Sequence, residues 1–204
     1  MNWLAHIVLS ENRIEYQLGN LLADRLKGKS WPGASPQFNE GLVMHRIIDR
    51  FTDHHPCVMR SRGRLGQQGL LRGVVIDIVY DHLLAKHWNS YAKMSFNSFI
   101  DQFNTQAMAT ITHYPSEVAS FLSRLITSGH LKRYQDFRGV DEALSRVDQR
   151  LSLRVLSRES CHEYLPQIKQ ELSMIEGDFT CFMPDLIAHF KSAFGDLRGD
   201  HWLI

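Results

Sequence analysis

Apolar residues recur every three or four positions along most of the chain, which is the spacing of amphipathic helices. The pattern predicts helical stretches over about residues 2–9, 10–28, 38–53, 73–88, 96–111, 116–129 and 140–156. The final stretch, 160–194, contains Pro184 and predicts either two helices or one kinked helix. Runs of strictly alternating apolar and polar residues, typical of strands, are missing from the sequence. We therefore expect an all-α fold, with one bundle-like domain over residues 1–198 and a tail over 199–204.

The stretch from Gly73 to Leu84 is apolar on almost every side of its predicted helix, which is typical of a buried helix. It nevertheless carries Asp77 and Asp81, which point the same way because they are four residues apart. An unpaired carboxylate in an apolar interior is costly, so each must be neutralised, paired with a cation or bound to a metal. Between positions 72 and 86 the sequence has no Lys or Arg. The partner must therefore come from another part of the chain or be a bound cation.

Other predicted helices also carry acids or imidazoles among their apolar positions. In the first 90 residues, four helices contribute such candidates: His6, Asp24, His45, Asp49, Asp53, Asp77, Asp81 and His82. If these positions face inward, carboxylate oxygens and imidazole nitrogens meet inside the bundle, and that donor set suits Mn²⁺, Fe²⁺ or Mg²⁺. Taken singly, each residue also has an ordinary structural explanation, such as a core histidine with a backbone partner or an acid beside an arginine. Both interpretations stay open at this point.

The composition is that of an ordinary globular protein. Of the 204 residues, 44% are hydrophobic and 22% charged, and the net charge of +1 gives no indication of nucleic-acid or membrane binding. The three cysteines form no CxxC pair, the first residues lack the segments of a signal peptide, and apolar runs stay below the ~20 residues of a membrane span. We therefore expect a cytoplasmic protein that binds neither nucleic acid nor membranes.

Four motifs resemble those of a known family: MNWLAH at 1–6, GNLLAD at 19–24, MHRIIDRFTD at 44–53 and DIVYDHLLAKHW at 77–88. A weaker match, LKRYQD, lies at 131–136. Together they resemble the acyl carrier protein phosphodiesterases, which look like a divergent branch of the all-α HD-type metal phosphohydrolases. The resemblance implies hydrolysis of the phosphodiester that joins 4′-phosphopantetheine to a serine of holo acyl carrier protein. It also implies a divalent metal, with Mn²⁺ expected and Mg²⁺ or Fe²⁺ as alternatives.

Carried over residue by residue, the resemblance implies two sets of site residues. The expected metal ligands are His6, Asp24, His45, Asp53, Asp77 and Asp81. The expected catalytic residues are Asn20, Arg46, Asp49 and His82, with the Arg46 guanidinium binding a phosphoryl oxygen. The dipeptide at 81–82 is Asp-His, the reverse of the superfamily's His-Asp, so its ligand order does not transfer directly.

Two stretches flanking these candidates are basic. The expected partner-binding residues are Arg25, Lys27, Lys29, Arg60, Arg62 and Arg64. Short basic stretches are commonly no more than solvated loops. Because acyl carrier proteins are small and acidic, however, the family resemblance implies that these loops dock the substrate protein and that its binding weakens with salt.

Two other functions fit the same residues. A phosphohydrolase with the same metal chemistry could act on a small nucleotide instead. Alternatively, a helical module without catalytic activity could bind acyl carrier protein or another acidic partner. The second alternative predicts that the buried acids pair with arginines and that no metal binds.

Overall fold

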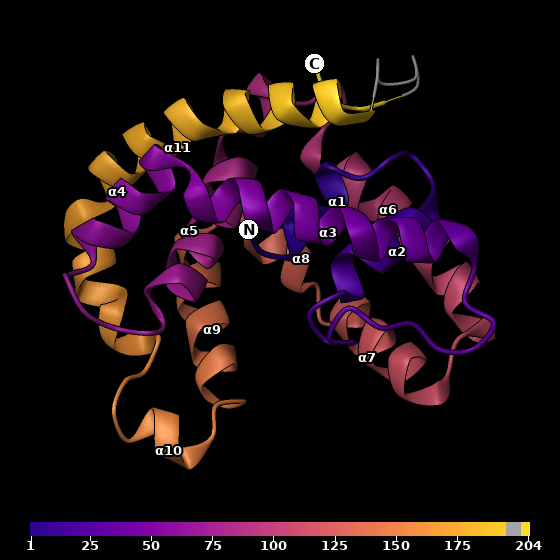
Figure 1. Ribbon diagram of the computed structural model, residues 1–204, viewed down its shortest axis with the longest axis horizontal. Coiled ribbons are helices and arrows are strands. Elements are labelled where there is room, and N and C mark those ends of the chain that lie inside the picture. The colour runs from indigo at the N-terminus through magenta and orange to yellow at the C-terminus, as the bar shows by residue number, and fades with distance from the viewer. Residues whose placement is uncertain (195–200) are drawn as a thin grey trace.

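The structure of the chain is a computed structural model that describes residues 1–194 and 201–204 (Figure 1). It confirms the all-α prediction. Helices form the regular secondary structure of the described residues, in which extended pairing amounts to one isolated bridge between Ala92 and Leu203. No helix in these two ranges is both long enough and apolar enough to span a membrane.

The helices fall into a longer and a shorter set. The longer ones are α1 (Trp3–Val8), α2 (Ile14–Leu22), α3 (Pro36–His54), α4 (Pro56–Arg64), α5 (Arg72–Lys86), α6 (Phe96–Thr110), α7 (Ser116–Thr127), α9 (Phe137–Asp148) and α11 (Leu165–Phe194). The shorter ones are η1 (Trp88–Ser90), η2 (Ile111–His113), α8 (His130–Arg133), α10 (Leu153–Leu156) and η3 (His162–Tyr164).

Most predicted helices lie where the apolar spacing placed them, and the differences have local causes. α4 was not expected, because its arginine-rich sequence has little apolar surface beyond Cys57 and Val58. α2 begins at Ile14 rather than near Ser10, because the Ser10 hydroxyl donates back to the carbonyl of His6 at 2.7 Å. α11 runs through Pro184 as one curved helix alongside α4, so the two-helix alternative for residues 160–194 is wrong (Figure 1).

α2 and α3 pack against each other at two glycines, where their backbones touch. A Cβ atom on Gly41 would lie 2.1 Å from the carbonyl oxygen of Tyr16, and one on Gly19 would lie 2.0 Å from that of Phe38. Neither position can therefore hold a larger side chain unless the helices separate. This close crossing brings residues at the end of α2 beside the middle of α3.

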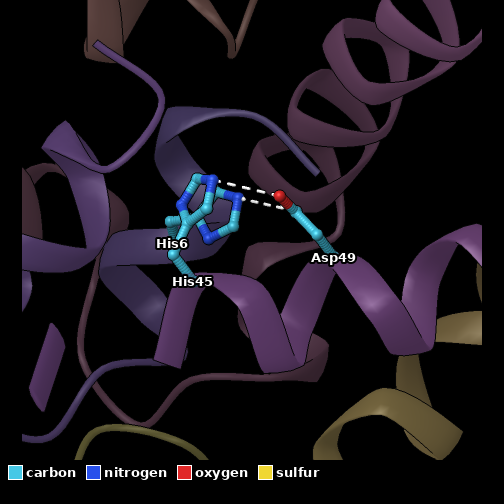
Figure 2. Close-up of side chains that lie close together, drawn as sticks. All are labelled: His6, His45 and Asp49. Atoms are coloured by element: carbon cyan, nitrogen blue, oxygen red, sulfur yellow. Dashed lines mark ion pairs between the residues drawn. The ribbon is translucent and has the colours of Figure 1, made fainter. Parts of the chain in front are cut away.

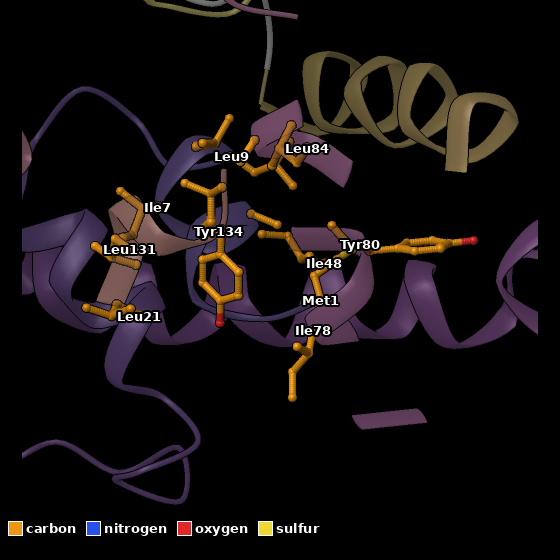
Figure 3. Packing of buried hydrophobic residues seen from close by; sticks show 14 of the residues in the cluster. Met1, Ile7, Leu9, Leu21, Ile48, Ile78, Tyr80, Leu84, Leu131 and Tyr134 are labelled. Carbon is orange, nitrogen blue, oxygen red and sulfur yellow. The ribbon is translucent and has the colours of Figure 1, made fainter. Parts of the chain in front are cut away.

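α5 runs through the hydrophobic core, as its apolar sequence predicted. Tyr80 and Leu84 are fully buried, and Figure 3 shows them among side chains from α1, α2 and α3. α11 covers α4 and is tied to it by the buried carboxylate of Asp178, which accepts from Arg60 at 2.9 Å and from Arg64 at 2.8 Å.

The predicted tail at 199–204 lies partly outside the described residues, which resume at His201. Residues 201–203 are buried, so this part of the segment is packed onto the protein. The Trp202 indole donates to the carbonyl of Val8 at 2.7 Å, and its ring lies edge-on to Phe99. The His201 ring contacts the carbonyl of Ser10 at 2.9 Å. These contacts tie the end of the chain to the turn that follows α1.

Candidate metal centre

His6 on α1 meets His45 and Asp49 on α3, with one ligand atom from each residue within 4.8 Å of the others (Figure 2). The Asp49 carboxylate lies 3.3 Å from His6 Nε2 and 3.0 Å from His45 Nε2. Asp49 follows His45 by one helical turn, so both side chains leave α3 on the same side. The two imidazole rings stack with centroids 3.9 Å apart, and both are buried. The Asp49 side chain is 35% exposed, which leaves one side of the cluster open to solvent.

Asn20 on α2 orients both rings. Its amide nitrogen donates to the carbonyl of His6 at 2.8 Å and to the Ser10 hydroxyl at 2.9 Å, so its side-chain oxygen must face the His6 ring. That oxygen lies 2.8 Å from His6 Nδ1, and the backbone oxygen of Asn20 lies 2.8 Å from His45 Nδ1. Both oxygens are acceptors, so each histidine carries its proton on Nδ1. Each Nε2 is therefore left to face the cluster, as in many protein metal sites.

The His6 Nε2 atom faces oxygen atoms without a hydrogen between them. Besides Asp49, the carbonyl of Met1 lies 3.1 Å away. Burial lowers the pKa of His6 despite the nearby carboxylate, so the ring is neutral at pH 7 and Nε2 presents a lone pair to other lone pairs. A cation placed between these atoms would turn this repulsion into attraction.

The charges on the other two side chains depend on each other. Burial opposes protonation of His45, but hydrogen bonds to Asp24 and Asp49 outweigh it and raise the pKa of His45 to about 9. Burial likewise opposes ionisation of Asp49, yet its hydrogen bond with protonated His45 and the nearby amino group of Met1 hold the pKa of this carboxyl well below its usual range. Without a metal, His45 therefore carries a positive charge between two carboxylates. A divalent cation would take over this role and release the proton.

These donors fit a divalent transition metal. Two imidazole nitrogens and a carboxylate, with solvent access on one side, are typical of Mn²⁺ or Fe²⁺ sites with open positions. Asp24 adds a further carboxylate, because its Oδ1 lies 3.0 Å from His45 Nε2 while 86% of its side chain is exposed. The structure thus brings together His6, Asp24, His45 and Asp49, with Asn20 behind the rings.

Asp77 and Asp81, the two acids on α5, lie beside this cluster and have other partners. The Asp77 carboxylate is 3.1 Å from the amino group of Met1, which is 3.7 Å from Asp49. Asp81 is fully buried and accepts the backbone N–H groups of Leu4 at 2.7 Å and Ala5 at 3.2 Å. Burial raises the pKa of Asp81 to about 7, although both hydrogen bonds oppose the shift. The Asp81 carboxylate therefore binds the backbone N–H groups at the start of α1, and both of its oxygens are occupied there.

Three other predicted site residues lie away from the cluster. His82 contacts the carbonyl of Tyr134 at 2.7 Å and packs edge-on against Phe137. Asp53 is exposed and accepts from Arg62 at 2.6 Å. Arg46 is exposed and lines a cavity of about 1040 Å³ between α3 and α11. Whether a residue reaches the cluster depends on which side of its helix faces the cluster. The spacing of residues along the sequence does not determine which side that is.

The predicted docking residues divide into two groups. The three arginines of α4 already form salt bridges within the chain: Arg60 and Arg64 pair with Asp178, and Arg62 pairs with Asp53. The second group follows α2: Arg25 pairs with Glu117 at 3.2 Å, and Lys27 and Lys29 are exposed in the turns beyond.

The role of Gly41 was not predicted from the sequence. This residue sets the spacing between the helices that carry Asn20 and His45, and a Cβ there would lie 2.8 Å from the backbone nitrogen of Asn20. An isolated glycine inside a helical pattern is a recognised indication of close backbone approach, and that signal was present at this position.

Comparison with known proteins agrees with the motifs. A family model described as acyl carrier protein phosphodiesterase matches residues 1–186. Among similar curated proteins, the acyl carrier protein phosphodiesterase of Yersinia pestis is 26% identical over 189 residues, which cover 92% of this chain and 96% of that protein. The protein of the same name from Serratia proteamaculans is 26% identical over 194 residues, covering 94% of this chain and 98% of its own length. No solved structure gives a significant match.

Proposed function

The chain belongs to the acyl carrier protein phosphodiesterase family, and we propose that it is an enzyme that removes 4′-phosphopantetheine from holo acyl carrier protein. Water adds to the phosphorus, and the bond from phosphorus to the serine oxygen breaks. The products are apo acyl carrier protein and 4′-phosphopantetheine. The match extends over residues 1–186, so the proposal draws on the whole helical core.

The observation that best supports a hydrolytic centre is the arrangement of His6, His45 and Asp49. Both Nε2 atoms and the Asp49 carboxylate converge on one point, and Asn20 fixes the proton of each ring on the far side. A purely structural cluster would gain nothing from a neutral His6 Nε2 that faces two oxygens. This geometry favours a metal enzyme over a helical module that only binds a partner.

We propose Mn²⁺ as the metal, held by His6, His45 and Asp49. When bound, such an ion lowers the pKa of a coordinated water and neutralises charge on phosphoryl oxygens. Asn20 keeps both imidazoles turned toward the ion, which is the role of a positioning residue.

Asp24 is the residue best placed to accept the proton of the attacking water. Without a metal, the hydrogen bond from His45 lowers the pKa of the Asp24 carboxyl, so it is ionised at neutral pH. A bound cation would likewise favour the ionised form of Asp24. Its exposed side chain stands where substrate approaches from solvent. The serine oxygen then gains its proton from solvent at this open edge.

The substrate protein is proposed to dock beside Asp24, on the turns that carry Arg25, Lys27 and Lys29. Lys27 and Lys29 are exposed, whereas the arginines of α4 are paired with acids of this chain. We propose that the reaction takes place in the cytoplasm, in keeping with three cysteines that form no disulfide.

Intact-mass spectrometry tests the function directly. Holo acyl carrier protein is incubated with the purified protein and Mn²⁺, and the mass of the carrier protein is followed. We expect conversion to the apo form, together with the appearance of 4′-phosphopantetheine. Conversion should stop when a chelator is added and resume when Mn²⁺ is restored. An unchanged carrier protein in the presence of Mn²⁺ would refute the proposal.

Two variants separate the metal centre from general effects of charge. Asp49→Asn keeps the size of the side chain but removes a ligand charge, and we expect at least a ~10³-fold loss of turnover. Asp101→Asn is the control, because Asp101 lies on α6 and pairs with Lys132 at the surface. It should be as active as the unmodified protein.

A further inference from the structure

A cleft opens beside Asp24, between Trp3 of α1, α7 and α9. It has two adjoining parts with volumes of about 390 and 530 Å³, and Trp3, Arg25, Phe121 and Arg150 line both. Asp24 lines the first part and also contacts His45 of the candidate metal centre. The cleft therefore leads from the edge of that centre toward the surface between α7 and α9, whose residues line its two parts.

The cleft is strongly cationic. Arg25, Arg146 and Arg150 line the first part, and Arg124 joins them in the second. Among the described residues that line the two parts, Asp24 is the one acid. A concave site with four arginines and one carboxylate favours an anionic ligand.

Arg146 is a partly buried arginine without a close carboxylate partner. Its side chain is 17% exposed, and burial opposes its charge and lowers its pKa. Within residues 1–194, the one carboxylate within 4.0 Å is Glu142, at 3.9 Å, and Glu142 also binds Arg133. A half-buried guanidinium with one distant, shared partner leaves most of its donors open to a ligand.

Aromatic rings contact two of the other arginines, Arg25 and Arg150, and form the walls of the cleft. The Arg25 guanidinium lies 4.4 Å from the centre of the Phe121 ring, and that of Arg150 lies 5.8 Å from the centre of the Trp3 ring. Trp3 and Phe121 meet edge to face at 6.1 Å. The cleft thus offers apolar walls for an uncharged chain next to cationic groups for an anion.

We propose that this cleft binds the 4′-phosphopantetheine arm of the substrate, with Arg146 binding its phosphoryl group and Trp3 and Phe121 lining its uncharged chain. The arm carries its charge at the end where the bond is cut, followed by an extended amide chain. This order matches the cleft, in which Asp24 and Arg146 line the part next to the metal centre. The inference rests on the proposed function and reassigns the phosphoryl contact that the sequence suggested for Arg46.

Binding measurements on the metal-free protein test this assignment without turnover. Free 4′-phosphopantetheine and pantetheine, which lacks the phosphate, are titrated by calorimetry. We expect the phosphorylated compound to bind the unmodified protein at least tenfold more tightly. Arg146→Met should remove this preference, and Arg146→Lys should restore part of it. Arg138→Met is the matched control, because Arg138 is exposed on the same helix and lines neither part of the cleft, so it should keep the full preference.

Kinetics separate this inference from the proposed function. With Mn²⁺ present, Arg146→Met should lower kcat/KM for holo acyl carrier protein about 10²- to 10³-fold while Mn²⁺ affinity stays unchanged. If the unmodified protein releases 4′-phosphopantetheine but Arg146→Met is equally active, the inference fails and the function stands. If the unmodified protein does not turn over holo acyl carrier protein, the function fails. Equal binding of the two compounds by the unmodified protein would also overturn the inference.

Discussion

Replacing Gly41 with alanine perturbs the spacing of α2 and α3 without touching any side chain of the metal centre. A Cβ at this position would lie 2.1 Å from the Tyr16 carbonyl oxygen and 2.8 Å from the Asn20 nitrogen. Both obstacles are backbone atoms, so no side chain can turn aside to make room. The helices must separate by roughly 1 Å to reach an ordinary contact distance.

That separation acts directly on the contacts that join the two helices at the site. The His45 ring contacts the Asn20 carbonyl at 2.8 Å and the Asp24 carboxylate at 3.0 Å. Lengthening each by roughly 1 Å ends both hydrogen bonds. A misplacement of that size costs about 10²-fold in rate. Overpacking costs about 1–3 kcal/mol of stability, and the better helix propensity of alanine offsets about 1 kcal/mol of that cost, so we expect a net loss of up to about 2 kcal/mol.

Turnover of holo acyl carrier protein and urea unfolding followed by far-UV circular dichroism measure the two effects. Gly177→Ala on α11 is the control, because nothing lies within 4 Å of a Cβ there. It should raise the free energy of unfolding by about 0.5–1 kcal/mol and leave turnover unchanged. A Gly41→Ala protein with the stability and turnover of the unmodified protein would refute the reasoning about this crossing.

Three further predictions concern the metal centre and its surroundings. Asn20→Ala should weaken Mn²⁺ binding about 10- to 100-fold by freeing the His6 ring, because its contact with His45 is through the backbone carbonyl and stays. An unchanged affinity in a calorimetric titration would contradict the positioning role of the Asn20 side chain. In the metal-free protein, protonated His45 has a pKa of about 9, above its unfolded value, so its stabilisation is complete below pH 6.5 and lost as the pH rises to 9. Urea unfolding in a chelator should then show a loss of about 2–3 kcal/mol over this interval, and a flat profile would count against the charge assigned to His45. Replacing both Lys27 and Lys29 with glutamate should weaken binding of acyl carrier protein roughly tenfold at low salt and flatten its salt dependence, whereas an unchanged affinity would move the docking surface elsewhere.

Helical periodicity was sufficient to predict the all-α fold, because most helices here bury an apolar stripe of ordinary width. It was insufficient for α4, whose buried surface is small and whose arginines bind Asp178 from a distant part of the chain. It also could not decide whether Pro184 ends α11, because packing against α4 determines that outcome.

The candidate site shows the same division between local and tertiary information. The four-residue spacing of His45 and Asp49 implied that their side chains leave the helix together, and the structure places them so. The same spacing grouped Asp81 with Asp77, but the N–H groups at the start of α1 hold both oxygens of Asp81. A buried carboxylate needs a partner, yet the sequence alone does not reveal whether that partner is a cation or the end of another helix.

Anomalous X-ray diffraction from crystals grown with Mn²⁺ tests the metal centre most directly, because it locates the ion without reference to activity. We predict a manganese peak bonded at roughly 2.0–2.3 Å to His6 Nε2, His45 Nε2 and the Asp49 carboxylate. A structure in which manganese is absent from these three residues, or binds elsewhere in a fully active protein, would contradict the account.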